Sequence, residues 1–502
     1  MSRLEYLNLT RNKITFIANS SFANSSVVKL DLSYNLISSL NCFKGLLTLT
    51  ELYLNNNNIT VVPRFTFFGL TRLKILDLSM NFITTFEKFA LPLVELQYLN
   101  ITGNRLDQVT QNNISNSVKI SRYLDMSNLN ISKIDSMTFW NLSNLTSLNL
   151  SHNQVDFIDP NNFVGFDNMH SLDVSHNRIK HLAFNGNVLS NLKAIYLGNN
   201  ELTNISTIFS DACSNIFPKI AELRLSHNNI EKFNNPQTNT LISLVILDLS
   251  FNKITDITLK YYSNLKNLNL SNNNLTRIDS AFFDNADSIE LLDLSHNNIR
   301  SLPPRTFHNM SNLKILNLSS NHISILHQDS LGELEHLSLL DLSLNNLYII
   351  KAGAFDECVK LTTLILDHNF LNTSDVINLP NNLFHLETLS VRGTPCAPEV
   401  KKSITIFCDP LDATVDEIIS SDNDNDIDKY VDINNSSTTT PVVPEPTQES
   451  DKDLTTIILV TCSVALVIVI GLLIIYFKIF RRRGFLNING SRTELETDNI
   501  AL

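Results

Sequence analysis

Histidine is the residue type whose spacing in this sequence first suggests chemistry. Five histidines occupy the same place, directly before an asparagine: His152, His176, His227, His296 and His368. If His152 and His176 lie on neighbouring strands, about 4.8 Å apart, their rings could share a metal ion or respond to pH. The alternative is that histidine is only a structural filler here. We favour that interpretation, so no metal site is predicted.

Other arrangements that support catalysis are missing from the sequence. No nucleophile stands beside a base, no paired carboxylates suggest a pocket, and no residue set has zinc-ligand spacing. Glycine occurs only 12 times, and no glycine cluster precedes a helical pattern as in a phosphate-binding loop. We therefore predict neither an enzyme nor a cofactor. The formal net charge of −12 argues against nucleic acid as a partner, although much of the acid lies between Asp409 and Asp432.

A nine-residue pattern must position these side chains. Residues 145–153 read L-x-x-L-x-L-x-x-N, and the pattern returns about every 24 residues. Its leucines point inward from a short strand, and its asparagine can satisfy backbone groups where the strand turns away. The asparagines are Asn12, Asn35, Asn57, Asn81, Asn104, Asn153, Asn177, Asn200, Asn228, Asn252, Asn273, Asn297, Asn321, Asn345 and Asn369. Leu129 replaces one of them, which predicts another hydrogen-bond arrangement and a local kink.

A second series, of phenylalanines, is predicted to stack inside the opposite side of the coils. Its members are Phe22, Phe67, Phe139, Phe163, Phe282, Phe307 and Phe355. One coil cannot bury its apolar face alone, so the coils must stack on one another.

This pattern resembles the leucine-rich-repeat family, in particular its extracellular class, which includes the ectodomains of Toll-like receptors. About sixteen clear repeats and an atypical seventeenth fill residues 1–391. The resemblance implies an α/β solenoid, a horseshoe with a parallel β-sheet on its concave face. The first repeat begins at Leu4, with neither a signal peptide nor a cysteine-containing cap before it. We therefore expect that the natural amino terminus is missing; a protein without a signal peptide is the alternative.

Residues between the leucines should project from the concave face. The aspartates and serines there match the family's filler residues, but the tyrosines do not, and amphipathic aromatic side chains are favoured at interfaces. The predicted ligand-face residues are Tyr6, Tyr34, Tyr53, Tyr98, Tyr123 and Tyr196. Sequons predict N-glycosylation at Asn19, Asn24, Asn58, Asn113, Asn130, Asn141, Asn204, Asn274, Asn309 and Asn372. Further sequons on the strands would place glycans on the concave face: Asn8, Asn100, Asn149, Asn269 and Asn317.

The cysteines are distributed unevenly. Residues 392–410 resemble the carboxy-terminal cap of extracellular leucine-rich-repeat proteins, which implies a disulfide between Cys396 and Cys408 and an oxidising compartment. The cap departs from the family pattern, because Asn is missing before the proline and only two of four cysteines are present. Cys42 and Cys358 are predicted to be buried and unpaired. Cys213 lies in the longest repeat, where an exposed thiol could form a mixed disulfide with a partner.

The pattern ends before the last hundred residues. Residues 411–453 are predicted to be disordered, first acidic and then rich in Ser, Thr and Pro like a stalk. Residues 454–477 carry no charge and are long enough to span a hydrocarbon core of ~30 Å. Basic residues follow directly, so the positive-inside rule places residues 478–502 in the cytoplasm as a short tail without a signalling domain. Ile500 and Leu502 have the form of a PDZ-domain ligand.

Taken together, these features predict a single-pass type I protein of the plasma membrane, with its repeats outside the cell. Its expected function is that of a receptor or adhesion protein, in immune recognition or otherwise, which binds a protein ligand and signals, if at all, through partners. One alternative is a membrane tether for a secreted factor, with Cys213 in a mixed disulfide. The other alternative is an intracellular scaffold anchored by its tail.

Overall fold

The computed structural model describes most of residues 3–410. Its gaps are residues 20, 23–24, 92–93, 107, 110–118, 141, 185–188, 206–216, 235–240, 260–261, 279, 284–285, 373–382 and 397–404. All of the described residues belong to the first of the two units into which the chain divides, with the boundary after Ser421. Cys213 and the predicted stalk, membrane helix and tail lie outside the described residues. Within the described part, no helix is both long enough and apolar enough to cross a bilayer.

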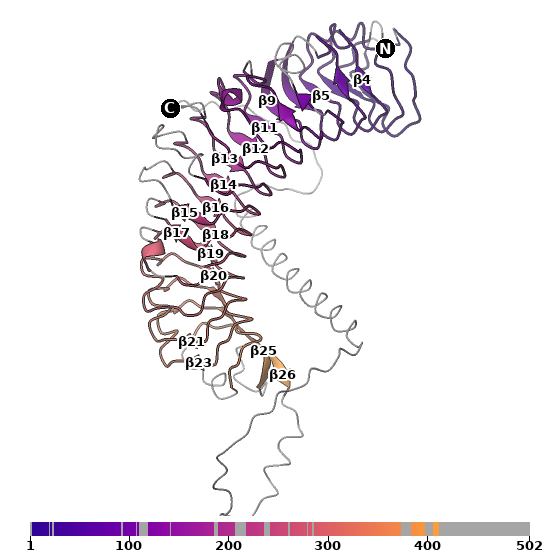
Figure 1. Ribbon diagram of the computed structural model, residues 1–502. Coiled ribbons are helices and arrows are strands. Elements are labelled where there is room, and N and C mark those ends of the chain that lie inside the picture. The colour runs from indigo at the N-terminus through magenta and orange to yellow at the C-terminus, as the bar shows by residue number, and fades with distance from the viewer. Residues whose placement is uncertain are drawn as a thin grey trace, which may run out of the picture. The chain divides into compact units, whose positions relative to one another are not determined.

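A parallel β-sheet of eighteen short strands runs through the first unit (Figure 1). Each strand pairs with the next one along the sheet, and every described pairing is parallel. The strands are, in sheet order, β1 (Tyr6–Asn8), β2 (Lys29–Asp31), β3 (Glu51–Tyr53), β5 (Ile75–Asp77), β7 (Glu95–Asn100), β9 (Lys119–Asp125), β11 (Ser147–Asn149), β12 (Ser171–Asp173), β13 (Ala194–Tyr196), β14 (Glu222–Arg224), β16 (Ile246–Asp248), β18 (Asn267–Asn269), β19 (Leu291–Asp293), β20 (Ile315–Asn317), β22 (Leu339–Asp341), β24 (Thr363–Ile365), β25 (Thr388–Cys396) and β26 (Thr405–Pro410).

The connections between these strands return along the other side of each coil, which we call the outer side. They contain four two-stranded sheets and two 3-10 helices (Figure 1). These are β4 (Val61–Val62) with β6 (Thr85–Phe86), β8 (Gln108–Val109) with β10 (Lys133–Ile134), β15 (Lys232–Asn234) with β17 (Asp256–Thr258), β21 (Ile325–Leu326) with β23 (Ile349–Ile350), η1 (Pro160–Phe163) and η2 (Ser280–Phe283).

The parallel-strand solenoid is confirmed, but the helical half of the predicted α/β class is not found in the described residues. Their connections contain only the 3-10 turns η1 and η2, each four residues long. About 24 residues must complete one coil, and extended segments and tight turns close such a short circuit without room for a helix of several turns.

The register of the sheet is nearly uniform. Leu148 of β11 lies opposite Leu124 of β9 on one side and Leu172 of β12 on the other. The pattern position of a residue, counted from the first leucine of L-x-x-L-x-L-x-x-N, therefore decides its neighbours. Positions three and five form two columns that project from the inner side of the sheet, because side chains alternate along a strand. The register shifts once among the repeats, between Leu96 and Tyr98, where β7 pairs with β9.

The asparagine series forms the predicted hydrogen-bond ladder. Asn297 is typical: its amide donates to the carbonyl oxygens of Leu270 (2.9 Å), Leu294 (3.1 Å) and Ser295 (3.1 Å). Its Oδ1 accepts the backbone N–H of Leu275 at 3.0 Å. One buried side chain thus closes its own turn and joins it to the preceding coil.

The coil with Leu129 lacks the ladder asparagine and pairs its backbone groups in another way. Leu129 is fully buried, and its backbone N–H donates to Oδ1 of Asn153 at 3.0 Å. The same Oδ1 accepts the N–H of Ile131 at 3.0 Å. The next asparagine in the ladder therefore satisfies two donors. The register shift between β7 and β9 lies at the start of the strands and is distinct from this turn.

The phenylalanine series is confirmed with one correction. Phe67, Phe139, Phe163 and Phe307 are 0–1% exposed, each ten residues after its ladder position. Phe282 was predicted to belong to the series, but Phe283 has that spacing and lies 6.2 Å from the ring of Phe307, centroid to centroid. The spacing from the ladder asparagine Asn273 is ten residues for Phe283 and nine for Phe282, so the signal was present in the sequence, and the stacking of the coils agrees with it.

The cysteines Cys42 and Cys358 are buried and free, as predicted. Their side chains replace apolar residues inside two separate coils and are 1% and 2% exposed. Burial disfavours the thiolate, so it raises the pKa of Cys42 to about 11 and that of Cys358 to about 12. Both thiols are therefore protonated and unreactive at neutral pH.

Tyr262 occupies the phenylalanine position of its coil, ten residues after Asn252, and is 0% exposed. Its hydroxyl has no hydrogen-bond partner among the described residues, and burial raises its pKa. An unpaired buried hydroxyl destabilises the folded state. We expect Tyr262→Phe to raise the free energy of unfolding by about 1 kcal/mol, measured by urea denaturation. Tyr348→Phe, at a 47% exposed site, should leave stability unchanged. A loss of stability in Tyr262→Phe would mean that the hydroxyl has a partner.

Candidate ligand-binding face

The structure divides the six predicted ligand-face tyrosines among three columns. Tyr6, Tyr98 and Tyr123 stand at position three, and Tyr53 and Tyr196 at position five, all on the inner side of the sheet. Tyr34 stands at position eight, in the turn after β2. The register joins four of these residues into two clusters on the amino-terminal repeats, while Tyr34 and Tyr196 lie apart from both.

The first cluster is centred on Lys29 of β2. The Nζ atom of Lys29 lies 5.6 Å from the ring centroid of Tyr6 and 5.0 Å from that of Tyr53. It also lies 3.0 Å from a carboxylate oxygen of Glu51, and the Tyr53 hydroxyl donates to Glu51 at 3.0 Å. The hydrogen bond to Glu51 raises the pKa of Lys29. A cation is thus held between two aromatic rings, with its side chain 40% exposed.

The second cluster is the pair Tyr98 and Tyr123 on β7 and β9. Their rings are stacked, with centroids 5.1 Å apart and planes at 14°. The Tyr123 hydroxyl donates to Oδ2 of Asp125 at 2.9 Å. Burial, and then the Asp125 carboxylate, raise the pKa of Tyr123, so its hydroxyl stays protonated. The pair is a rigid aromatic surface with fixed polar ends, a combination that protein interfaces favour.

The other two tyrosines are engaged locally. Arg11 lies over the ring of Tyr34 at 5.4 Å. The Tyr196 hydroxyl donates to Glu222 at 3.2 Å, and Nε of Arg224 donates to the same carboxylate at 2.6 Å. Strands β11 and β12, with Ser147 and Ser171 at position three, separate Tyr196 from the Tyr98–Tyr123 pair.

No two aspartates at position five stand on adjacent strands between β1 and β22, and the alternation of aspartates with other residues is broken once, where Tyr196 and Arg224 are neighbours. The column alternates between aspartate and other residues: Asn8, Asp31, Tyr53, Asp77, Asn100, Asp125, Asn149, Asp173, Tyr196, Arg224, Asp248, Asn269, Asp293, Asn317 and Asp341. Aspartates and asparagines make the same bond, in which Oδ1 accepts the backbone N–H two residues on, as in Asp77 and Asn149. Alternation keeps like charges from facing each other across about 4.8 Å.

Burial already raises the pKa of Asp77, and the carboxylates of Asp125 and Asp31 add to it. Asn149→Asp would put a third carboxylate between Asp125 and Asp173. We expect it to destabilise the fold by about 1 kcal/mol at pH 7. Only ionised carboxylates repel one another, so the loss should shrink as the pH falls and the carboxylates become protonated. Urea denaturation at pH 7 and pH 4.5 measures the loss of stability at each pH. Ser151→Ala removes the same sequon without adding charge; an equal effect in both variants would contradict the electrostatic cause.

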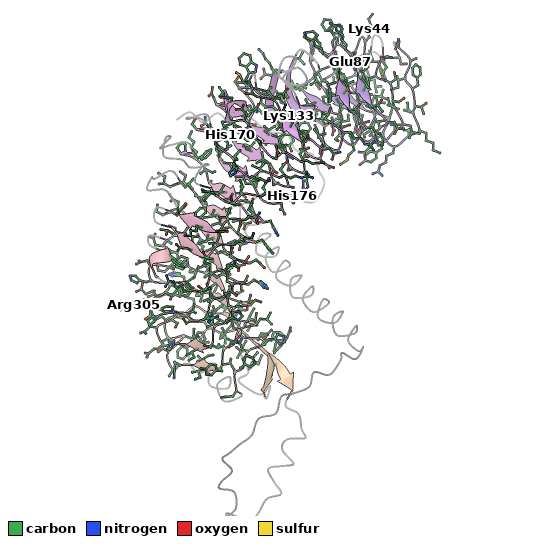
Figure 2. The ribbon with its side chains drawn as sticks, in the orientation of Figure 1. Lys44, Glu87, Lys133, His170, His176 and Arg305 are labelled. Carbon is green, nitrogen blue, oxygen red and sulfur yellow. The ribbon has the colours of Figure 1, made fainter. Side chains whose placement is uncertain are left out.

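The five histidines stand at position eight, where the backbone is left-handed, with φ of 52–55°. His152 and His176 stack face to face, with centroids 4.0 Å apart and planes at 12°. Burial, and then His152, lower the pKa of His176. His176 projects toward the inner side of the coils (Figure 2). No group of three or more metal-ligating side chains exists among the described residues.

The left-handed turn is a feature that sequence reasoning missed. Residues at position eight share it throughout the described repeats, for example Arg11, Asn199, Asn272 and Gly103. Asparagine, histidine and glycine tolerate this conformation better than most residues. The preference for those three types at one position of the pattern was the available signal.

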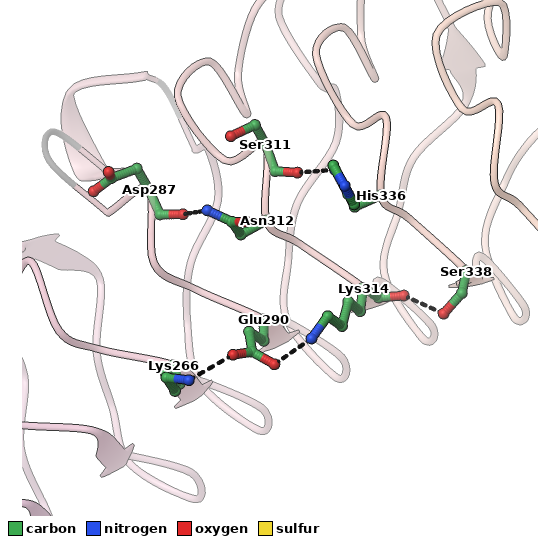
Figure 3. Close-up of polar contacts among 8 residues, drawn as sticks. All are labelled: Lys266, Asp287, Glu290, Ser311, Asn312, Lys314, His336 and Ser338. Atoms are coloured by element: carbon green, nitrogen blue, oxygen red, sulfur yellow. Dashed lines mark hydrogen bonds and ion pairs between the residues drawn. The ribbon is translucent and has the colours of Figure 1, made fainter.

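A second ladder, also missed, runs along the edge where the chain enters each strand (Figure 3). Asn312 donates to the carbonyl oxygen of Asp287 at 2.9 Å, and Asn168, Asn191 and Asn264 make the same bond in other coils. Beside it, Glu290 bridges Lys266 (2.8 Å) and Lys314 (2.5 Å). The signal was an asparagine directly before the first leucine of the pattern.

The sequons fall into two structural groups. Asn19, Asn58, Asn130, Asn204, Asn274, Asn309 and Asn372 are exposed, whereas Asn24, Asn113 and Asn141 lie outside the described residues. The strand sequons differ, because the side chains of Asn100, Asn149, Asn269 and Asn317 are half-buried and accept a backbone hydrogen bond. Occupancy at the exposed sites stays a prediction.

The carboxy-terminal end of the sheet carries the predicted cap. Strand β26 pairs with β25, with Cys408 opposite Val391 and Pro410 opposite Cys396. Cys408 is disulfide-bonded. The side chain of Cys396 lies outside the described ones, so the pairing of Cys396 with Cys408 stays a prediction. Ile500 and Leu502 also lie outside the described residues.

Comparison with protein families agrees with this geometry. The family model described as leucine rich repeat matches residues 2–50, 47–106, 122–179, 263–323 and 311–371, together more than half of the chain. A related leucine-rich-repeat model matches residues 240–257.

Several curated proteins are similar in sequence. Bovine (Bos taurus) keratocan is 30% identical over 218 residues, which are 41% of this chain and 57% of keratocan. Podocan of Mus musculus is 25% identical over 286 residues, 51% of this chain and 45% of podocan. Toll-like receptor 9 of Mus musculus is 30% identical over 163 residues, 30% of this chain and 16% of the receptor. The chain thus spans little more than half of keratocan and less of the other two. These matches indicate no catalytic family.

Solved structures share the fold at low sequence identity. The Drosophila Toll–Spätzle complex matches with a TM-score of 0.62 and 19% identity, over 77% of this chain and 54% of that one. A leucine-rich-repeat protein of Leptospira interrogans matches with a TM-score of 0.57 and 24% identity, over 81% and 96%. The mouse RP105/MD-1 complex matches with a TM-score of 0.53 and 24% identity, over 78% and 72%. From the repeat register, the asparagine ladder and the family matches together, this chain belongs to the leucine-rich-repeat family.

Proposed function

We propose that this chain is a cell-surface leucine-rich-repeat protein that binds a protein ligand through the inner face of its amino-terminal repeats. The observation that carries the proposal is the pair of aromatic clusters there. Lys29 between Tyr6 and Tyr53, and the stacked Tyr98 and Tyr123, offer fixed amphipathic side chains where other strands carry filler residues. Aromatic side chains supply much of the binding energy of protein interfaces.

Relatives agree with protein binding as the general role. The chain is related to leucine-rich proteoglycans and Toll-like ectodomains. Two solved structures with this fold are complexes with another protein, MD-1 or Spätzle. At that identity the likeness concerns the fold alone, so the choice of binding face depends on this chain's own tyrosines.

The cellular arrangement is part of the proposal. The uncharged residues 454–477, followed by basic residues, support a single span with the repeats outside and residues 478–502 in the cytoplasm. Signalling would pass through partners, with Ile500 and Leu502 as a candidate PDZ ligand. A peptide-N-glycosidase treatment of the full-length protein from its native cells tests this orientation. A large downward shift in mobility supports it, and no shift would favour the intracellular scaffold.

A tether for a secreted factor is the second candidate, because the chain carries Cys213 in its longest repeat. Non-reducing electrophoresis of the protein from its native cells separates the two. A high-mass species that Cys213→Ser abolishes would favour the tether, whereas its absence would favour a non-covalent receptor.

The ligand face is tested with alanine variants. A panel of secreted and cell-surface proteins is screened for binding to cells that display the full-length chain. For a protein that binds, we expect Tyr98→Ala and Tyr123→Ala each to weaken binding about tenfold or more, as central aromatic contacts do. Tyr348→Ala, at a 47% exposed site in a carboxy-terminal repeat, is the matched control. Equal binding by all three variants would exclude the Tyr98–Tyr123 surface as the ligand face.

A further inference from the structure

Three phenylalanines, two of them exposed and one half-buried, form a cluster on the outer side of two neighbouring coils. Phe65 follows β4 and is 48% exposed, and Phe68 is 64% exposed. The ring of Phe65 lies 5.7 Å from that of Phe68, edge to face, and 6.0 Å from that of Phe89, which follows β6. The Phe65 N–H donates to the Phe89 carbonyl oxygen at 3.0 Å, so the two turns are joined. Large apolar groups exposed together mark interaction surfaces more often than single ones do.

The backbone under these rings is in an unfavourable conformation. Phe65 has φ 63° and Phe89 has φ 64°, in the left-handed region that costs a bulky residue about 1–2 kcal/mol. Gly353, eight residues after its ladder asparagine as Phe65 is, has φ 82° and meets the same requirement without a side chain. Arg305 and Met137 take the same conformation at this place in their coils, with φ of 61° and 59°. The turn therefore requires the left-handed backbone, but it does not require a phenylalanine there.

A carboxy-terminal coil supplies an internal comparison. Arg305 and His308 stand where Phe65 and Phe68 stand, eight and eleven residues after the ladder asparagine. The Arg305 N–H donates to the Asp329 carbonyl oxygen at 3.0 Å, the same bond that Phe65 makes. Arg305 lies on the outer side of the coils, as Glu87 does (Figure 2). The turn therefore forms equally well with polar residues, and the phenylalanines are not a requirement of the solenoid.

Two cations cover the faces of these rings. The guanidinium carbon of Arg64 lies 4.9 Å from the centroid of Phe65 and 5.9 Å from that of Phe89. The Nζ atom of Lys88 lies 5.1 Å from the centroid of Phe89. The carboxylate of Glu87 accepts the backbone N–H of Arg64 at 3.0 Å, and neither cation is in an ion pair within the described residues.

This arrangement determines the charge that the cluster presents. Aromatic rings are negative on their faces and positive at their edges. Cations lie over Phe65 and Phe89, so the cluster of Arg64, Phe65, Phe68, Lys88 and Phe89 presents apolar ring surface together with two positive groups. Glu87 is the one carboxylate described beside them, so the net charge of the cluster stays positive. The cluster is both apolar and electropositive, in a chain whose net charge is −12.

We propose that this cluster, which we call the Phe65 cluster, is a docking site for an acidic protein segment that carries aromatic or aliphatic side chains between its carboxylates. The apolar side chains would pack on Phe65 and Phe68, and the carboxylates would pair with Arg64 and Lys88. The site lies on the outer side of the coils, and it is independent of the inner face proposed above for the ligand.

A selection from a phage-displayed library of random twelve-residue peptides tests the proposal on the immobilised full-length chain. Peptides are counter-selected on the variant Arg64→Glu/Phe68→Ser/Lys88→Glu, whose substitutions are at exposed side chains outside the left-handed positions. We expect enriched peptides to combine Asp or Glu with Phe, Trp or Leu. The variant should bind a synthetic copy of an enriched peptide at least tenfold more weakly. The matched control, Arg305→Glu on the outer side of a carboxy-terminal coil, should bind it normally.

Several results would overturn the proposal. One is enrichment of neutral or basic peptides, or of none. Another is equal weakening by Arg305→Glu, which would indicate a general charge effect. Two further measurements test other occupants of the cluster. They are binding of the chain to vesicles that contain phosphatidylserine, and sedimentation of the chain alone, which detects self-association. If acidic peptides fail to bind and the chain binds vesicles in a way that the triple variant abolishes, the cluster would be assigned to a membrane. If the chain instead self-associates and the triple variant does not, the cluster would be assigned to a second copy. Ligand binding at the inner face should be unchanged in the triple variant, so the two proposals fail separately.

Discussion

Asn297→Ala is expected to lower the free energy of unfolding by about 3 kcal/mol or more. The asparagine is 5% exposed and makes four bonds, three as donor and one as acceptor. Alanine would leave the Leu275 N–H without its partner. Each of the three carbonyl oxygens would lose one of its two donors and keep the other. A buried backbone group left unpaired costs about 1–3 kcal/mol, and water entering the cavity would restore only part of that. Urea denaturation followed by circular dichroism measures the change.

The adjacent asparagine provides the control for this prediction. Asn298 is exposed, and its amide is not among the described ladder bonds, so Asn298→Ala should change stability by less than about 0.5 kcal/mol. Because each coil contacts only its neighbours, the loss in Asn297→Ala should also appear as faster hydrogen exchange in the coils on either side. Similar stability of the two variants would show that the ladder contributes little.

Phe307→Ala should be comparably destabilising, by about 3–5 kcal/mol, the usual range for a buried aromatic residue replaced by alanine. Phe307 is 0% exposed and stacks against Phe283 at 6.2 Å. The cavity would lie between stacked coils, which are held by their own ladder bonds and cannot collapse fully. The midpoint of urea denaturation should fall without a change in the spectrum of the folded protein.

Exposure, rather than residue type, should decide the size of this effect. Phe384 is 91% exposed, so Phe384→Ala should leave the denaturation midpoint within error of the wild type. If Phe384→Ala were as damaging as Phe307→Ala, aromatic character rather than burial would be the cause, and the packing argument would fail.

The sequence by itself determined the repeat, because the requirements of one coil are local. The leucines of residues 145–153 and the buried asparagine are set by the geometry of a single turn, so their periodicity reports the solenoid directly. The same locality made the roles of Asn297, Cys42 and most of the phenylalanine series predictable. The exception, Phe282 in place of Phe283, arose where two neighbours have the same chemistry and only their distance from the ladder asparagine tells them apart.

Only the tertiary structure decided which side chains meet, because residues on adjacent strands are about 24 positions apart and their contacts depend on register and rotamer. Six tyrosines were predicted as one face, yet Tyr98 and Tyr123 stack while Tyr34 and Tyr196 are engaged elsewhere. The Phe65 cluster lies outside the leucine and asparagine pattern, so the periodicity of the sequence did not predict it. Its significance comes from the exposure of its rings and the placement of cations over them, which depend on neighbouring coils rather than on either coil alone.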